Sequence, residues 1–125
     1  MLISQIYHKH PITLQSDATV VEAVEKLRHD HVNGLIILSP SGKIAGVLSI
    51  QDIAAATVPR QFRKNVRMAA AMYMPGFFAE MCHSIKDKKV SKIMRRDFIS
   101  VSLSDNIMSV TADFLKNDLY IVPVI

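Results

Sequence analysis

The sequence predicts an α/β fold built from two modules of one kind, packed with approximate two-fold symmetry. Three observations predict it: a strand–helix–strand–strand–helix order within residues 12–58, a second copy of its opening near the C-terminus, and a composition able to form a core. Half of the 125 residues are apolar and 21% are charged, which is typical of folded rather than disordered chains. This length suits one compact domain or two small modules that share a core.

The first module begins with a short strand-like segment, residues 12–14, followed by a helix. Thr19 stands three residues before Glu22, in the arrangement that caps helix N-termini. The next residues carry apolar side chains at the spacing of a helix with one buried face, namely Val20, Ala23, Val24 and Leu27. The pattern therefore predicts a helix that starts at Val20.

A hairpin and a short helix complete this module. Residues 35–38 form a continuous branched apolar run, which is typical of a buried strand. Residues 39–42 have turn composition, and residues 43–50 read as a second strand that pairs with the first. The alanine-rich residues 52–57 then predict a short helix.

The opening of this module recurs near the C-terminus. An ungapped alignment of residues 3–38 with residues 90–125 matches few identities but carries over the apolar pattern. The second copy stops at Ile125, in the middle of its hairpin, and nothing corresponds to residues 39–58. A strand without its partner leaves a sheet edge exposed. We expect either that the sequence has been shortened or lacks a tail, the explanation we favour, or that another copy covers the gap.

These observations divide the chain into module 1 at residues 1–58, a helical linker at 59–89, and an incomplete module 2 at 90–125. The linker starts with a basic run, residues 60–67, and continues with a segment rich in methionine, alanine and phenylalanine. Methionine fills cores and adaptable interfaces alike, so this segment is equally consistent with internal packing and with a partner contact.

The segment from Gly46 to Ile53, together with residues 32–37 and 42–44 before it, resembles the CBS domain, named from cystathionine β-synthase. Residues 90–94 and 122–124 resemble the opening and the middle of another such domain. The resemblance implies tandem CBS modules, known as a Bateman module, with the order β-α-β-β-α. It also implies a regulatory role, a homodimer, and binding of AMP, ADP, ATP or S-adenosylmethionine between the modules.

The resemblance also implies site residues. Ser49 would contact phosphate, Asp52 the ribose, Val47 the base, and Asn33 occupies a position that can face the phosphates. The opposite wall would come from module 2, with Met94, Ile99, Tyr120 and Ile121. The corresponding segment of module 2 would lie beyond Ile125, so a second site, lined by Ile12 and Thr13, would lack its carboxylate. We therefore expect one competent adenosine site.

The residues themselves allow two interpretations of the Ser49–Asp52 pair. A serine between a strand and a helix would direct its hydroxyl and nearby N–H groups outward, where they favour an anion. The same spacing is also that of a helix cap, which needs no ligand.

Other functions have less support in the sequence. The histidine pairs and Cys82 do not form a ligand set with metal-binding spacing, and one cysteine excludes an internal disulfide. A net charge of +4 and two basic clusters allow nucleic-acid binding as a further alternative, although no nucleic-acid motif accompanies them. A scaffold that dimerises without a ligand is another. We expect no catalytic activity and no required cofactor. We also expect a cytoplasmic location, since no signal peptide or membrane span is present.

Overall fold

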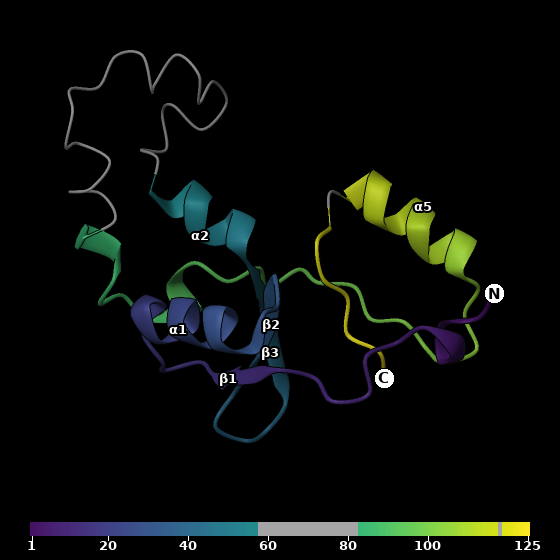
Figure 1. Cartoon of the computed structure of the whole chain (residues 1–125), viewed down its shortest axis with the longest axis horizontal. Helices are drawn as coiled ribbons and strands as arrows, with labels where there is room; N and C mark the ends of the chain where they lie inside the picture. Colours follow the sequence, from purple (N-terminus) through teal and green to yellow (C-terminus); the bar gives the residue numbers. More distant parts are fainter. Residues whose placement is uncertain (58–82, 118) are drawn as a thin grey trace, which may run out of the picture.

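The computed structural model describes residues 1–57, 83–117 and 119–125. Module 1 has the predicted order, with β1 (Thr13–Gln15), α1 (Val20–Asp30), β2 (Gly34–Leu38), β3 (Ile44–Ser49) and α2 (Ile50–Ala56) (Figure 1). The strands form one sheet in the order β1-β2-β3, in which β1 and β2 are parallel and β2 and β3 are antiparallel. The predicted hairpin is therefore confirmed.

Helix α1 begins and ends where local chemistry dictates. The Thr19 hydroxyl accepts a hydrogen bond from the Glu22 N–H at 3.3 Å, which confirms the predicted cap. The helix ends at Asp30 and is followed by the C-cap residue His31, which has a left-handed φ of 53° and whose backbone N–H donates to carbonyl groups of the last turn. Its apolar face packs on the sheet in a first core that includes Leu27, Leu35 and Leu48.

Module 2 repeats the opening of module 1 at one constant offset. The short 3₁₀ helices η1 (Ile3–Gln5) and η3 (Val90–Lys92) start at residues 3 and 90, and α1 and α5 (Ile107–Asn117) start at 20 and 107, an offset of 87 residues in both cases. The pairing of Leu14 with Ile37 recurs as that of Val101 with Val124. The ungapped alignment is thus also a structural one, and it gives the predicted two-fold relation between the modules.

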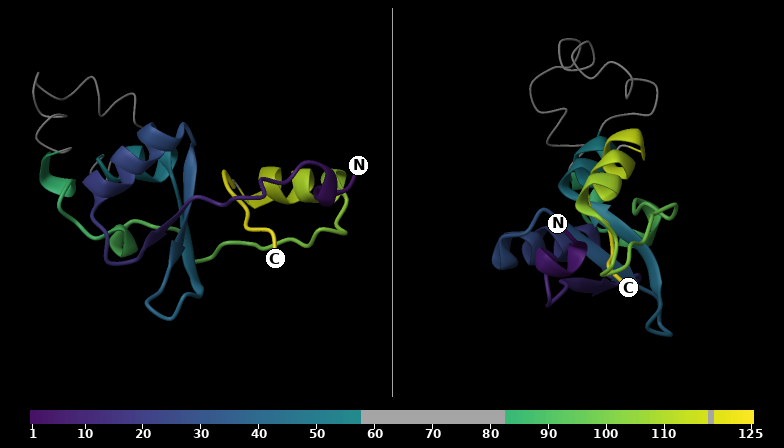
Figure 2. Two further views of the ribbon diagram at one scale, coloured as in Figure 1. Left: turned by 60° about the horizontal axis from the view of Figure 1, so that its bottom comes forward. Right: turned by 90° about the vertical axis from the view of Figure 1, so that its right-hand side faces the viewer.

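The first residues of each module pack in the core of the other module. The Val90 N–H donates to the Ala18 carbonyl at 2.8 Å, and its counterpart Ile3 donates to the Asp105 carbonyl at 2.9 Å. Val90 is fully buried in the first core, whereas Ile3 belongs to a second core with Val101 and Val110. Figure 2 shows the N-terminal segment running beside α5. This exchange ties the modules together through their first residues.

The linker predictions fall mostly on residues 58–82, which lie outside the described residues. The division into modules at 1–58 and 90–125, with a linker at 59–89, stays a prediction. In the described part of the chain, no helix combines the length and the apolar character that a membrane crossing requires.

Candidate functional site

A cavity of about 620 Å³ lies between the modules, on the sheet face opposite α1. Successive strand residues point to opposite faces, and Leu35 and Ile37 fill the core under α1. Their neighbours Gly34, Ile36 and Leu38 therefore line the cavity. The rest of the wall comes from Val32, Asn33 and Ile44 of module 1, from the N-terminal segment, and from module 2 at residues 101–124. A cavity of this volume is within the range of small-molecule sites.

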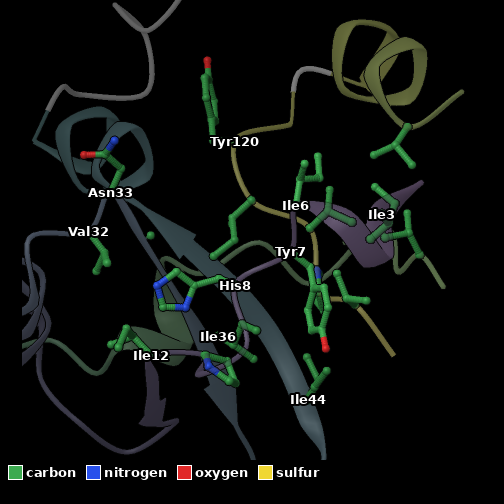
Figure 3. A pocket seen from close by; sticks show the side chains of 18 of the residues that line it. Ile3, Ile6, Tyr7, His8, Ile12, Val32, Asn33, Ile36, Ile44 and Tyr120 are labelled. Atoms are coloured by element: carbon green, nitrogen blue, oxygen red, sulfur yellow. The ribbon is translucent and has the colours of Figure 1, made fainter. Parts of the chain in front are cut away.

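The cavity wall is mainly apolar, with a few polar side chains at defined places. Ile12, Val32 and Ile36 supply branched apolar surface, and in Figure 3 the His8 imidazole lies between these side chains and Tyr7. Further polar lining residues are Lys9, Thr13, Asn33 and Tyr120. Among the lining residues that the structure describes, none is acidic. The arrangement suits a flat apolar group with a polar or anionic extension.

Ser49 and Asp52 form a closed helix cap beside this cavity. The Asp52 carboxylate accepts hydrogen bonds from the Ser49 N–H and from the Ser49 hydroxyl, both at 2.9 Å. The Ser49 hydroxyl in turn accepts from the Asp52 N–H at 3.1 Å. The Ser49 residue is only 1% exposed. Of the two interpretations of this pair, the structure has the helix cap, in which the Ser49 hydroxyl is hydrogen-bonded to Asp52.

The cap adjoins one end of the cavity through the backbone. The Ile50 N–H donates to the Asn33 carbonyl at 3.0 Å, so the first turn of α2 is fixed to a cavity residue. Gly34 lies against Ile121, because a Cβ at Gly34 would be 3.1 Å from the Ile121 side chain. Asn33 and Gly34 thus connect the first turn of α2 with Ile121 of module 2.

The sequence-predicted site residues separate into two groups. Asn33, Tyr120 and Ile121 line the cavity, together with Ile12 and Thr13, which were predicted for the incomplete second site. The second group lies outside the cavity lining and comprises Ser49, Asp52, Val47, Met94 and Ile99.

Two residues of this second group have packing partners. Val47 and Met94 are buried, and the Val47 backbone pairs with Arg95. The Met94 side chain packs against Gly46, where a Cβ would approach its sulfur to 2.9 Å. The ligand roles of the whole predicted set stay predictions.

The cavity also contains residues that sequence reasoning did not assign, notably His8 and Lys9. The repeat could have indicated them. With the offset of 87 residues, they are equivalent to Arg95 and Arg96, a basic pair that can face phosphates. In the structure, Arg95 pairs with Asp97 at 3.6 Å and Arg96 donates to the Ser91 carbonyl at 2.9 Å. The basic residues that line the cavity therefore come from the N-terminal segment.

The histidines do not gather into a metal site within the described ranges, where no three His, Cys, Asp or Glu side chains lie close enough to hold a metal ion. His29 is instead hydrogen-bonded to Asp30 at 3.2 Å. This bond, together with the nearby Lys26, lowers the pKa of Asp30.

Comparisons with known proteins agree with this architecture. The family model of the CBS domain matches residues 3–58. The chain is 24% identical to the uncharacterized protein MJ1426 of Methanocaldococcus jannaschii, over all of this chain and 80% of that protein. Residues 3–58, a little under half of the chain, therefore match the CBS domain, and this match is consistent with a CBS-domain protein.

Solved structures extend the likeness to the whole chain. A CBS domain pair of protein MJ0100, in complex with 5′-methylthioadenosine and S-adenosylmethionine, superposes with a TM-score of 0.70 at 22% identity, over 100% of this chain and 80% of that chain. A CBS-domain protein of Agrobacterium tumefaciens gives 0.75 at 13% identity, over 98% and 76%. At these identities the likeness establishes the fold, which is that of a CBS domain pair.

Proposed function

We propose that this protein is a regulatory module that binds an adenosine-containing ligand in the cavity between its two CBS modules. The observation that carries the proposal is the cavity of about 620 Å³, which both modules line and which combines apolar surface with a few polar groups. The complex of the MJ0100 domain pair with two adenosine compounds supports the ligand class.

The purine is expected to occupy the apolar part of the cavity. Ile12, Val32 and Ile36 offer branched side chains to its faces, and the His8 ring offers a flat surface for stacking. Removing a purine from water against these side chains supplies affinity, and the exposed Asn33 amide at the end of the cavity can hydrogen-bond to the ligand.

The charges of the lining favour a phosphorylated ligand. Lys9 contributes an ammonium group, and among the described residues of the lining no carboxylate opposes it. AMP, ADP and ATP carry phosphates that such groups attract. S-adenosylmethionine carries a positive sulfonium instead, so we expect it to bind more weakly than AMP.

Asp52 keeps its proposed role as the ribose contact. Its Oδ2 atom accepts both hydrogen bonds from Ser49, which leaves Oδ1 to accept from a ribose hydroxyl. Support for this role comes from the first turn of α2, which is hydrogen-bonded through the Ile50 N–H to the carbonyl of the cavity residue Asn33. Ser49 would then position Asp52 rather than contact phosphate directly.

Isothermal titration calorimetry of the full chain with AMP, ATP and S-adenosylmethionine tests the proposal. We expect about one adenosine site per chain, and a Lys9→Met variant that loses affinity for AMP about tenfold, since a charge-assisted hydrogen bond contributes roughly 1.5–3 kcal/mol. Lys116→Met is the matched control, because Lys116 is an exposed lysine of α5 outside the cavity lining.

Three results would contradict the proposal. The first is the absence of heat with every adenosine ligand, which would favour a ligand-free scaffold. The second is an equal loss of affinity in the two lysine variants, which would indicate a general charge effect rather than a contact in the cavity. The third is a steep salt dependence of binding to random duplex DNA, which would favour the nucleic-acid alternative.

A regulatory module needs a partner that reads its state, and we propose a homodimer. Support comes from α5, where Met108 is 73% exposed and Leu115, two turns later on the same face, is 81% exposed. Sedimentation of the wild type and of Met108→Glu tests this. We expect the charge to shift a dimer toward monomer, whereas a monomeric wild type would contradict the dimer without touching the ligand proposal.

A further inference from the structure

Gly34 of module 1 and Ile121 of module 2 occupy equivalent positions and contact each other. The offset of 87 residues that relates the two modules takes position 34 to position 121. A Cβ at Gly34 would lie 3.1 Å from the Ile121 Cδ1 atom and 3.4 Å from the Ile121 Cβ atom. A two-fold rotation that exchanges the modules also exchanges these two residues, so it maps their contact onto itself. The contact therefore lies on the approximate two-fold axis.

Contacts away from this axis occur as related pairs. The Ile3 N–H and the Val90 N–H are one offset apart, and each donates to a carbonyl of the other module. The chain neighbours of the axial pair are also equivalent to each other, because the same offset takes Asn33 to Tyr120. Both line the cavity, and Figure 3 shows them at the same end of it. The axial contact therefore lies at this end of the cavity.

The two axial positions carry side chains of very different size. Glycine has no Cβ, and the Ile121 side chain occupies the space that a side chain at position 34 would need. Carbon atoms in favourable contact are about 3.5–4.0 Å apart, so isoleucine at both positions would overlap. Glycine at both positions would leave a void and lose the packing of the isoleucine. One glycine and one isoleucine fill the axis without overlap.

We propose that Gly34 and Ile121 select the pairing of module 1 with module 2 over the pairing of like modules from two chains. The modules repeat each other in their opening 3₁₀ helix and in their first α-helix, so two like modules can meet in the same two-fold arrangement. Two copies of module 2 would then place isoleucine against isoleucine, and two copies of module 1 would place glycine against glycine. Both residues line the cavity, so the pairing that they select also forms the cavity between the modules.

Exchanging the two side chains tests this pair. Gly34→Ile crowds the axis and Ile121→Gly leaves a void, whereas the variant with both changes again has one glycine and one isoleucine. Hydrogen exchange of the Ile3 and Val90 amides is the readout, because each donates to the other module. We expect exchange at both amides to be at least about tenfold faster in each single variant, and to return to within about threefold of the wild-type rate in the double variant.

Further variants serve as matched controls. Gly34→Ile combined with Ile44→Gly removes an isoleucine side chain elsewhere in the cavity lining, and we expect no recovery of the exchange rates. A Cβ at Gly34 would also lie 3.3 Å from the Leu48 carbonyl oxygen of its own module. Gly34→Ala adds only a methyl group and repeats the cycle if Gly34→Ile does not fold. Its exchange at Val90 should be faster than in the wild type, and should recover on adding Ile121→Val, which removes the Cδ1 atom.

Spin labels report which modules pair. A nitroxide on Asn33→Cys, in a Cys82→Ser background, gives one label per chain beside the axis, so a short distance between labels arises when two copies of module 1 pair. With the native axial pair, double electron–electron resonance of a concentrated sample is expected to show no such distance. The distance should appear with Ile121→Gly, which makes both axial positions glycine, and should disappear again when Gly34→Ile is added.

Three outcomes would overturn the inference. Exchange in the double variant that stays as fast as in Gly34→Ile would mean that the two side chains are not matched in size. Equal recovery with Ile44→Gly would indicate relief of general crowding. A short label distance with the native axial pair would show that like modules pair in spite of it. None of these readouts depends on adenosine binding, so this inference and the ligand site can fail independently.

Discussion

The Ser49→Ala variant separates the capping role of Ser49 from a direct role in ligand binding. Ser49 is 1% exposed, and the change removes its hydroxyl, which accepts from the Asp52 N–H at 3.1 Å and donates to the Asp52 carboxylate at 2.9 Å. Loss of an N-cap acceptor costs about 1 kcal/mol. The hydrogen bond to a charged group adds roughly another 1–2 kcal/mol. We therefore expect the free energy of unfolding to fall by about 2 kcal/mol without any ligand.

Urea denaturation followed by circular dichroism measures this change. For a chain of 125 residues, a loss of this size corresponds to a fall of about 6–10 °C in the melting temperature. Ser41→Ala is the control, because the Ser41 hydroxyl is exposed and bonds only to the Ser39 hydroxyl at 2.8 Å, and it should change the stability by less than about 0.5 kcal/mol. Equal stabilities of Ser49→Ala and the wild type would refute the capping argument.

Three further predictions concern the fold itself. Val90→Ala removes two buried methyl groups from the core of module 1 and should lower the free energy of unfolding, measured in urea, by about 2 kcal/mol. The control Ser91→Ala should leave this free energy nearly unchanged. Equal effects would contradict the packing of the first residues of module 2 in the core of module 1. Gly42→Ala places a side chain at a φ of 84° and should cost about 1 kcal/mol by the same measurement, and an unchanged stability would contradict the left-handed conformation of this turn. The His29 hydrogen bond lowers the pKa of Asp30, so this carboxylate stabilises the fold at neutral pH. That stabilisation is lost as the pH falls through the folded-state pKa of Asp30. Asp30→Asn should therefore show a shallower loss of stability in acid than the wild type.

Local patterns in the sequence predict module 1 almost completely. The cap at Thr19 and the apolar spacing after it define α1, and the branched run with its turn defines the hairpin. The repeat is equally informative, since the ungapped alignment places α5 at its observed position. These features depend on residues that are close together along the chain, and the periodic spacing of apolar residues predicts such local structure.

Long-range packing is what the sequence does not reveal. Ile3 and Val90 are single apolar residues in short 3₁₀ helices, and no periodicity indicates that each packs on the other module. The orientation of the Ser49 hydroxyl also depends on the Asp52 rotamer. Spacing alone does not decide whether this pair caps the helix or contacts a ligand. Lys9 reaches the cavity only because the N-terminal segment crosses to module 2.

Contacts between protons of the ligand and of the protein test the central proposal most directly. In a complex with AMP, the adenine H2 and H8 protons should show intermolecular nuclear Overhauser effects to the methyl groups of Ile12, Val32 and Ile36, which line the cavity. Leu48, buried on the opposite face of the sheet, should show none. Effects confined to exposed methyl groups of α5, such as those of Leu115, would place the purine elsewhere and contradict a site between the modules.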